Sequence, residues 1–488
     1  MPSSTTRFVL VLAVFVWGSL GVSPATAQGG DEVPPNIVLV MADDLGYGDL
    51  GSYGQTQIQT PNLDQMAQQG MRFTQFYAGS TVCAPSRSVL MTGQHTGNTP
   101  VRGNMRPGGI GNAPLPEGSV TLAEVLNEAG YVTGGFGKWG LGGPSSTGLP
   151  TKQGFDQFYG YLDQLRAHYY YPEFLYKNGE RISLPDNQVE ENPPIEGAGL
   201  PVHKGTYSHD AIMDRAFSFM DRHQDDRFFL YLPVTIPHAG LTVPNESRAP
   251  YLDESGNSIF PEDSFSGGHY PEQPMPYATY AGMVSRLDRD IGRLFEKLRA
   301  LGLDENTIVL FTSDNGPHDA GGYDPSVLDS NGPLRQGKGT LYEGGIRVPM
   351  IARWPGQVPS GARSPHVAYL GDLMATLADL ANVPSPKPND SMSFLPTLLG
   401  NEAQQQAHEA LYWEYYSGAT RQAVRMGKWK AVRSPMQHGT MELYNLERDL
   451  SERQDVSDAH PEIVGQIEEI MQAEHTPSDH WSVPPPEK

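Results

Sequence analysis

The chain contains a single cysteine, within the stretch Thr81-Val82-Cys83-Ala84-Pro85-Ser86-Arg87-Ser88-Val89-Leu90-Met91-Thr92-Gly93. Pro85 fixes its own φ and disfavours the helical region for Ala84, so we predict that a helix begins near Pro85 and that Cys83 lies just before it. The side chain of Cys83 would then lie at the positive end of the helix dipole, with the charge of Arg87 one turn away. A buried structural cysteine is the alternative interpretation, because free cysteines are among the most buried residues.

The pattern Cys83-x-Pro85-Ser86-Arg87-x-x-x-x-Thr92-Gly93 resembles the signature of the type I sulfatases. In that family a maturation enzyme reads the signature and oxidises the cysteine to formylglycine, an aldehyde whose hydrate supplies the nucleophilic oxygen. The resemblance extends over essentially the whole mature chain, including Glu442-Leu443-Tyr444-Asn445-Leu446 near its end. It implies an alkaline phosphatase-like α/β fold with a large, mixed, mostly parallel sheet between helices and a smaller C-terminal α+β domain.

The first residues are typical of a secretory signal peptide. Arg7 precedes the apolar run Phe8–Val22, and Ala25-Thr26-Ala27 provides a small-x-small cleavage site. No cysteine comes directly after the apolar run, so we expect no lipid anchor, and no second apolar stretch is long enough to span a bilayer. We therefore expect a protein that is secreted or periplasmic after cleavage near Ala27, with no membrane partner.

Composition limits the domain organisation and the partners. A signal peptide at 1–27, a catalytic domain at 28–385 and a small domain with an antiparallel sheet and a terminal helix at 386–488 are expected, because Pro384–Pro388 marks a boundary. The net charge of −22 opposes general binding of nucleic acid or acidic membranes. With one cysteine, no disulfide forms within the chain, so a large packed core must stabilise it.

Two apolar runs end in carboxylates. Asn36–Met41 and Thr307–Thr312 are typical of buried parallel strands, and the polar residues Asp43, Asp44, Asp314 and Asn315 follow them. Ligands bind at the carboxyl ends of such strands, and an oxygen-only donor set suits Ca²⁺ or Mg²⁺. Taken alone, Asp43 and Asp44 are equally compatible with a solvated turn. The resemblance implies all four residues as metal ligands, with Ca²⁺ the usual ion and Mg²⁺ the alternative.

Four further residues match positions at which sulfatases hold the nucleophile and the sulfate: Arg87, Lys138, His238 and Lys338. Fixed cations in a pocket with little water stabilise the charge that a sulfate monoester accumulates in the transition state. His238 follows an expected strand at Arg227–Val234 and is the candidate for protonating the leaving oxygen, because imidazole titrates near neutrality.

The chain departs from the family pattern at Gly140, where family members often have a histidine. In the family that histidine helps to deprotonate the second hydroxyl of the hydrate, so that sulfate is released. We hypothesise that another histidine replaces it, with His95, His168 and His203 as candidates, or that the acids on the metal side suffice.

The substrate is less constrained than the chemistry. Residues 141–207 are rich in glycine, proline and tyrosine and are expected to form long loops. His168, with the tyrosines that follow it, Arg102 and Asn104 are candidates for a sugar subsite, and packing within the loop is the alternative. We therefore expect an exported hydrolase that removes sulfate from a sulfated carbohydrate or another sulfate ester. A phosphonate or phosphodiester hydrolase of the same fold and an inactive glycan-binding homologue are the alternatives.

The remaining pattern gives three local expectations. Apolar spacing predicts a helix from Tyr280 to Leu301, and Ser119 is the expected N-cap of a helix that ends at Gly130. Gly332–Pro349 is too rich in glycine for a helix and is expected to be a loop.

Overall fold

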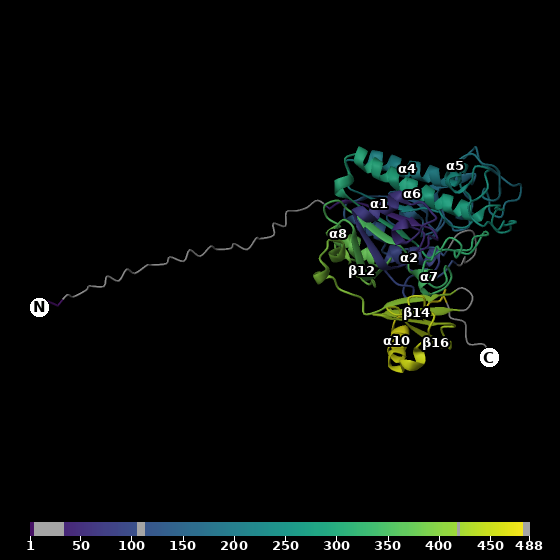
Figure 1. Ribbon diagram of the computed structural model, residues 1–488. Coiled ribbons are helices and arrows are strands. Elements are labelled where there is room, and N and C mark those ends of the chain that lie inside the picture. Colours follow the sequence, from purple (N-terminus) through teal and green to yellow (C-terminus); the bar gives the residue numbers. More distant parts are fainter. Residues whose placement is uncertain (4–33, 105–112, 417–419, 482–488) are drawn as a thin grey trace. The chain divides into compact units, whose positions relative to one another are not determined.

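A ten-stranded mixed sheet forms the centre of the computed structural model, which describes residues 1–3, 34–104, 113–416 and 420–481 (Figure 1). Its strand order is β12-β2-β11-β10-β1-β9-β3-β4-β5-β6. The strands are β1 Asn36–Ala42, β2 Met71–Tyr77, β3 Val132–Lys138, β4 Gln157–Tyr161, β5 Phe174–Lys177, β6 Glu180–Ser183, β9 Phe228–Pro233, β10 Thr307–Ser313, β11 Met350–Arg353 and β12 Ala362–Tyr369.

The central strands are parallel. β1 pairs in parallel with β10 on one side and with β9 on the other, and β9 pairs in parallel with β3. The register aligns Ala42 with Ser313, so the loops that follow β1 and β10 begin side by side. This alignment brings together the acidic residues that follow the two strands.

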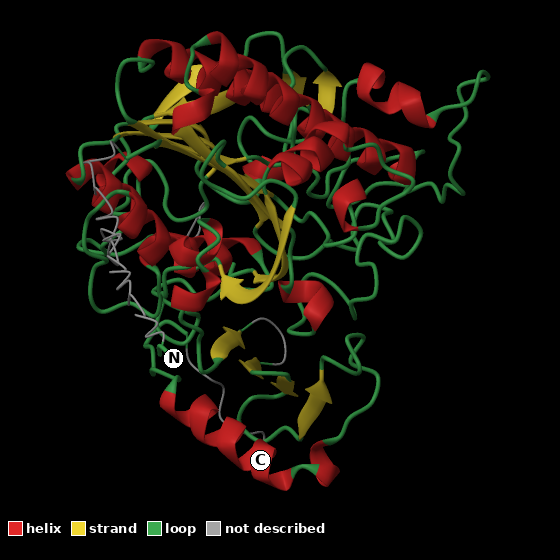
Figure 2. Ribbon diagram, turned by 60° about the vertical axis from the view of Figure 1, so that its left-hand side comes forward, coloured by secondary structure: helices red, strands yellow, loops and turns green. Residues whose placement is uncertain are grey.

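Helices cover both faces of the sheet (Figures 1 and 2). Val38 and Val40 of β1 belong to one core, with residues of α1, α4 and α6, whereas Ile37 and Leu39 belong to a second core, with residues of α2, α3 and α8. This alternation follows from the two-residue period of a strand that is buried on both faces. The helices are α1 Pro61–Gln69, α2 Cys83–Thr92, α3 Leu122–Glu128, α4 Ser208–Arg222, α5 Asn245–Arg248, α6 Pro276–Ala300, α7 Glu343–Ile346, α8 Asp372–Leu380, α9 Leu395–Leu398 and α10 Pro461–Ala473.

A second, four-stranded antiparallel sheet follows in the C-terminal part of the chain, in the order β13-β14-β15-β16 (Figure 1). Its apolar side chains form a separate core with Ile467 and Met471 of α10. The strands are β13 Leu411–Tyr415, β14 Arg421–Met426, β15 Trp429–Arg433 and β16 Met441–Asn445, and a small separate pair joins β7 Gln188–Val189 to β8 Pro201–His203. The large mixed sheet between helices and the smaller C-terminal α+β part confirm the expected fold class.

Several local expectations were wrong. Residues 141–207 are not only loops, because they contribute β4, β5 and β6, which extend the main sheet beyond β3. The glycine-rich segment 332–349 contains the single-turn helix α7. The N-cap of α3 is Thr121 instead of Ser119, because Thr121 and Glu124 form a reciprocal capping box.

The long helix α6 begins at Pro276, earlier than its apolar spacing indicated, because proline is well suited to the first helical turn. The described residues from Pro35 to Trp481 belong to one compact unit. The predicted signal peptide lies outside the described residues except for its first three positions. No helix in the described ranges is long and apolar enough to cross a membrane.

Candidate functional site

Cys83 is buried at the first position of α2, not before the helix as expected. Helix α2 begins two residues earlier than predicted because Val82 is extended and acts as the N-cap, and because Oδ1 of Asn104 accepts a hydrogen bond from the N–H of Ala84. Pro85 is then the third helical residue, where its missing N–H has no helical partner to lose. The thiol therefore lies at the positive end of α2.

The Cys83 thiol lies between a carboxylate and an ammonium group. Its Sγ is 3.4 Å from Oδ1 of Asp43 and 3.5 Å from Nζ of Lys338. Burial and the neighbouring charge of Asp43 raise the pKa of this thiol to about 12. The unmodified cysteine is therefore protonated at neutral pH and is a poor nucleophile.

Asp43 and Asp44 are buried directly after β1, and Asp314 and Asn315 directly after β10. Asp44 has a φ of +64°, in the left-handed region, and its N–H donates to Oδ1 of Asp314 at 3.2 Å. Nδ2 of Asn315 donates to Oδ1 of Asp44 at 2.7 Å. The four predicted ligands therefore come together at one edge of the sheet, as the strand pattern indicated.

Three cations surround these carboxylates. Nζ of Lys138, from the end of β3, is 2.7 Å from Oδ2 of Asp43, and Nζ of Lys338 is 2.7 Å from Oδ1 of Asp44. Nη2 of Arg87, on α2, is 2.7 Å from Oδ2 of Asp314 and 3.6 Å from Oδ2 of Asp43. The other terminal nitrogen of Arg87 donates to the carbonyl oxygen of Lys138, which ties α2 to the end of β3.

The carboxyl groups of the site differ in their pKa values. Burial alone would raise the pKa values of Asp43 and Asp44, but the opposing charges, led by Lys138 for Asp43 and Lys338 for Asp44, hold both below the usual range. Burial and the negative charge of Asp43 raise the pKa of Asp314 to about 6 despite the nearby Arg87. Three carboxylates in one buried site repel one another, and a bound cation would relieve this repulsion.

His238 faces Asp44 with an acceptor atom on each side and no hydrogen atom between them. Nδ1 of His238 is 2.9 Å from the carbonyl oxygen of Ala239 and must donate to it, so Nε2 is the acceptor in the neutral ring. Nε2 lies 3.4 Å from Oδ2 of Asp44, which is also an acceptor. Burial and the charge of Lys338 lower the pKa of His238 to about 3, so the free ring is neutral and a proton or a cation is needed between the two acceptors.

The residues present fit a hard divalent cation. One ligating atom from each of Asp43, Asp44, Cys83 and His238 lies within 4.8 Å of the others, a set that contains two of the four predicted ligands and not Asp314. Oδ1 of Asn315 is buried and has no hydrogen-bond partner among the described residues. A free amide oxygen beside carboxylate oxygens is the donor set that Ca²⁺ and Mg²⁺ prefer.

Aromatic rings cover the outer side of His238. The ring of His168 stacks on it with centroids 4.6 Å apart and an interplanar angle of 14°. Tyr270 contacts both rings, with centroid distances of 5.4 Å to His168 and 6.4 Å to His238. The ring centroid of His318 lies 6.0 Å from that of His238. Sequence reasoning missed Tyr270 and His318, because they lie in irregular segments without a motif.

The space beside Gly140 is occupied by Gln164. Gly140 has a φ of +79°, and a Cβ added there would lie 2.0 Å from Nε2 of Gln164 and 3.8 Å from Cδ of Arg87. Both polar atoms of the Gln164 amide are buried without a partner among the described residues. The position at which the family often has histidine is therefore filled by an amide from another segment, a residue that sequence reasoning missed.

The other candidate residues separate into two groups. Asn104 lies beside Cys83 through its bond to Ala84, and His168 lies on His238, so both are at the site. Arg102 is buried in a different network, 3.6 Å from Glu414 and donating to the carbonyl oxygens of Thr99 and Thr476. Arg102 was expected to line a sugar subsite. In the structure it contacts the C-terminal part of the chain instead.

Two of the three candidate replacement histidines also have partners elsewhere. Nε2 of His95 is 2.8 Å from Glu474, at the end of α10. His203 lies on the exposed strand β8, and its Nδ1 is 2.6 Å from the carbonyl oxygen of Asp186. Of these three candidates, only His168 contacts His238, which lies next to the carboxylate of Asp44.

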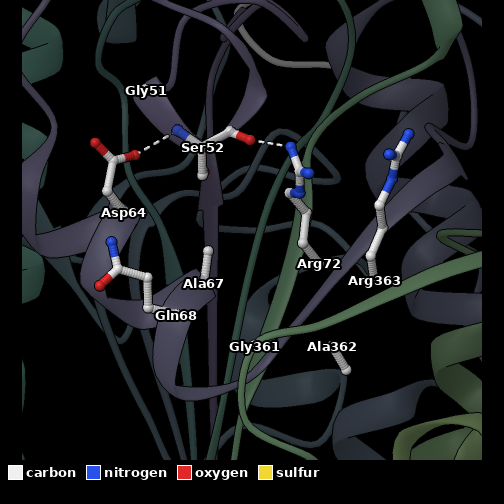
Figure 3. A pocket seen from close by; sticks show the side chains of 9 residues that line it. All are labelled: Gly51, Ser52, Asp64, Ala67, Gln68, Arg72, Gly361, Ala362 and Arg363. Atoms are coloured by element: carbon white, nitrogen blue, oxygen red, sulfur yellow. Dashed lines mark hydrogen bonds between the residues drawn. The ribbon is translucent and has the colours of Figure 1, made fainter.

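Cavities differ between the two ends of the sheet. A cavity of 700 Å³ is lined by Lys338, Gln336 and Tyr323, at the end where the carboxylates lie. A smaller one of 330 Å³ lies where β2 and β12 begin, with Arg72 and Arg363 extending side by side from the two strands (Figure 3). None of the predicted site residues lines the second cavity, so the chemistry belongs to the carboxyl-terminal end of the central strands.

Comparison with known protein families agrees with this geometry. The family model described as Sulfatase matches residues 35–383. The chain belongs to the sulfatase family. A second model, described as N-sulphoglucosamine sulphohydrolase, C-terminal, matches residues 336–476 of this sulfatase. The resemblance of the Cys83 signature to sulfatases is thereby confirmed, and the protein is a sulfuric ester hydrolase.

Curated and structurally solved relatives cover most of this sulfatase. Arylsulfatase A of Homo sapiens is 38% identical over 419 residues, which cover 82% of this chain and 74% of the relative. N-acetylgalactosamine-6-O-sulfatase of Bacteroides thetaiotaomicron is 30% identical over 522 residues, which cover 92% and 94% of the two chains. The crystal structure of Ps i-CgsB in complex with k-i-k-neocarrahexaose has a TM-score of 0.72 at 29% identity, covering 91% of this chain and 94% of that one.

Proposed function

We propose that this sulfatase removes sulfate from a sulfated carbohydrate, using a formylglycine made from Cys83 and a divalent cation, Ca²⁺ or Mg²⁺, held by Asp43, Asp44, Asp314 and Asn315. The observation that carries the proposal is the position of Cys83 Sγ, between the Asp43 carboxylate and the Lys338 ammonium at the start of a buried helix. A matured residue at this place would contact both the cation site and a fixed positive charge. When bound, the cation would polarise the sulfate and make the hydrate hydroxyl of formylglycine more acidic.

Maturation is part of the proposal because the unmodified thiol is unsuited to attack. Its pKa of about 12 leaves almost no thiolate at neutral pH. The chain carries the complete family signature that a formylglycine-generating enzyme reads, from Cys83 to Gly93. Export through the predicted signal peptide at 1–27 and the division at residue 385 remain parts of the same proposal.

The cations would bind and orient the sulfate. Lys138 and Lys338 are held by Asp43 and Asp44, so their positions are fixed before a substrate arrives, and Arg87 is fixed by Asp314. Pre-positioned charges stabilise the developing negative charge without the cost of reorganising solvent. Nζ of Lys338 also reaches the Cys83 side chain, so it would orient the nucleophile.

His238 would protonate the leaving oxygen of the sugar. Its neutral ring accepts at Nε2, and the negative charge of a bound sulfate ester favours the protonated imidazole. His168 stacks on His238 and is itself neutral, because burial lowers its pKa well below the usual value. Of the three candidate histidines, His168 alone contacts a residue of the site, so we propose that it takes the proton that the absent histidine at Gly140 would have taken.

A carbohydrate substrate is supported by the surroundings of the site and by relatives. Aromatic faces such as those of His168 and Tyr270 suit the apolar faces of sugar rings. The relatives include a protein named N-acetylgalactosamine-6-O-sulfatase and one solved with a neocarrahexaose. Asn104, next to Cys83, is the candidate for a hydrogen bond to the sugar.

The proposal is tested by comparing substrates on the matured protein. Turnover of 4-nitrophenyl sulfate is expected to exceed that of 4-nitrophenyl phosphate and of a phenylphosphonate monoester, and a panel of sulfated mono- and oligosaccharides is expected to release sulfate. Faster turnover of the phosphonate monoester would instead assign the chain to phosphonate hydrolysis. Absence of turnover of every ester by protein whose Cys83 is fully converted would support a binding role.

A further inference from the structure

A cavity of 540 Å³ lies next to the site described above. It is bounded by the segment after β8, by α5 and by residues 266–274. Tyr270 lines this cavity and also packs against His168 and His238, so one ring lies between the cavity and the histidine that would protonate the leaving oxygen. A substrate that extends beyond one sugar has this space beside it.

Two cations line the cavity without a carboxylate partner. Neither Lys204 nor Arg248 forms an ion pair with a described residue, and the nearest bond of Arg248 is from Nη2 to Oδ1 of Asn245 at 3.0 Å. Nε of Arg248 is buried without a hydrogen-bond partner among the described residues. Acidic residues are abundant in this chain, whose net charge is −22, yet none forms an ion pair with either cation among the described residues. Two neighbouring cations without one are suited to an anion from outside.

The acidic residues around the cavity do not neutralise this pair. Glu246, on α5, lies 3.2 Å from Arg286 instead. Glu272 lines the cavity but forms no ion pair with Lys204 or Arg248. Burial and the charge of Arg248 lower the pKa of Lys204, as expected for like charges placed together.

We propose that Lys204 and Arg248 form a second anion-binding subsite, which holds a carboxylate or sulfate group on the sugar unit next to the one that loses its sulfate. This inference rests on the proposed function, because it takes the substrate to be a sulfated glycan. It adds that the glycan is an oligosaccharide or polysaccharide with a negative charge on the neighbouring unit. Tyr270 would pack between the two units.

The test is a binding measurement that needs no turnover. Calorimetric titration of the full-length protein uses two probes: a chondroitin 6-sulfate tetrasaccharide, which carries carboxylates and sulfates, and an ι-carrageenan tetrasaccharide, which carries sulfates alone. The double variant Lys204→Gln/Arg248→Gln is expected to bind at least one probe about fivefold or more weakly than the wild type. Weakening for the first probe alone assigns the subsite to carboxylate, and weakening for both assigns it to sulfate.

A charge control is Arg363→Gln, which removes one positive charge from the 330 Å³ cavity at the start of β12 (Figure 3). Its affinities are expected to stay within about twofold of the wild type. Turnover of 4-nitrophenyl sulfate by the double variant is also expected to stay within about twofold, because this ester has no second charged unit. If the matured wild type hydrolyses neither that ester nor any sulfated saccharide, the proposed function fails while the binding result still decides the subsite.

Three results would overturn the subsite. The first is unchanged affinity of the double variant for both probes. The second is equal weakening by Arg363→Gln, which would show that overall charge is responsible. The third is no measurable binding of either probe to the wild type.

Discussion

Two buried clusters of charge in this sulfatase have opposite designs. At the carboxyl ends of β1 and β10, Asp43, Asp44 and Asp314 are packed with three cations, and Oδ1 of Asn315 is left without a partner among the described residues. Where the C-terminal sheet meets α7, Lys430 lies 3.0 Å from Glu343 and 3.4 Å from Glu452.

The second cluster is complete. Glu343 also accepts from Tyr77 at 2.9 Å and lies 3.1 Å from Arg347, and Glu452 accepts the N–H of Glu343. Each carboxylate oxygen there has a partner, whereas the first cluster has an unused acceptor and a histidine acceptor that faces a carboxylate. We conclude that the first cluster has acceptor atoms free to bind a ligand, whereas the second cluster stabilises the contact between two parts of the fold.

The largest expected effect is on catalysis. Cys83→Ala removes the proposed nucleophile, so kcat for 4-nitrophenyl sulfate is expected to fall by about 10⁴-fold or more. The thermal unfolding midpoint is expected to change little, because the side chain is small. Retention of more than a tenth of the activity would show that Cys83 is not the nucleophile.

The opposite pattern is expected at the second cluster. Lys430→Met leaves Glu343 and Glu452 without their shared ammonium, so the free energy of unfolding is expected to fall by about 3–5 kcal/mol. Denaturant unfolding measures this loss, and kcat is expected to stay unchanged at a temperature where the variant is folded. A stable Lys430→Met variant with impaired kcat would break the distinction between the two clusters.

A divalent cation is expected to stabilise the first cluster alone. Calcium at about 100 times its dissociation constant contributes about 2.7 kcal/mol to the folded state. The unfolding midpoint should therefore rise with Ca²⁺ and fall again with a chelator, and Asp44→Asn should abolish the response. Glu452→Gln, in the second cluster, is the control that should keep it; loss of the response in this control would contradict the assignment.

Restoring histidine at Gly140 is expected to be destabilising. A Cβ at this position clashes with Nε2 of Gln164, and a φ of +79° strains any residue with a side chain, so Gly140→His should lose about 2 kcal/mol of unfolding free energy. Gly140→His combined with Gln164→Gly should recover part of the loss, because the clash is removed. A single variant as stable as the wild type would show that Gln164 does not fill this space.

The smallest expected effect concerns Asp49, a buried carboxyl group outside both clusters. Asp49 accepts from Tyr280 and from the N–H of Gly46, both at 2.6 Å, and burial raises its pKa to about 7. The folded state therefore keeps a proton that the unfolded chain loses above pH 3.8, so stability is lost as pH rises through about 7. Between pH 6 and pH 8 this loss amounts to about 1.4 kcal/mol.

Asp49→Asn tests this dependence, because the amide oxygen can still accept both hydrogen bonds. Denaturant unfolding at pH 6 and pH 8 should show a smaller decline for the variant than for the wild type. An identical decline in the two proteins would mean that Asp49 does not carry the proton.

The sequence was sufficient where local pattern and topology act together. The apolar runs before Asp43 and Asp314 predicted two buried strands, and the rule that parallel strands share an edge placed the acids together. The sequence was insufficient where packing between distant segments determines which residues are in contact. The packing of Gln164 beside Gly140, the tilted contact of Tyr270 with His168 and the burial of Arg102 against Glu414 depend on tertiary contacts without a local signal.

The most direct test of the central claim is the mass of the tryptic peptide that ends at Arg87, taken from protein made in its native host or together with a maturation enzyme. This peptide contains Cys83. Conversion to formylglycine predicts a loss of about 18 Da relative to the thiol peptide. An unmodified thiol peptide from protein that hydrolyses sulfate esters would contradict the account, because the nucleophile would then have to be a different group.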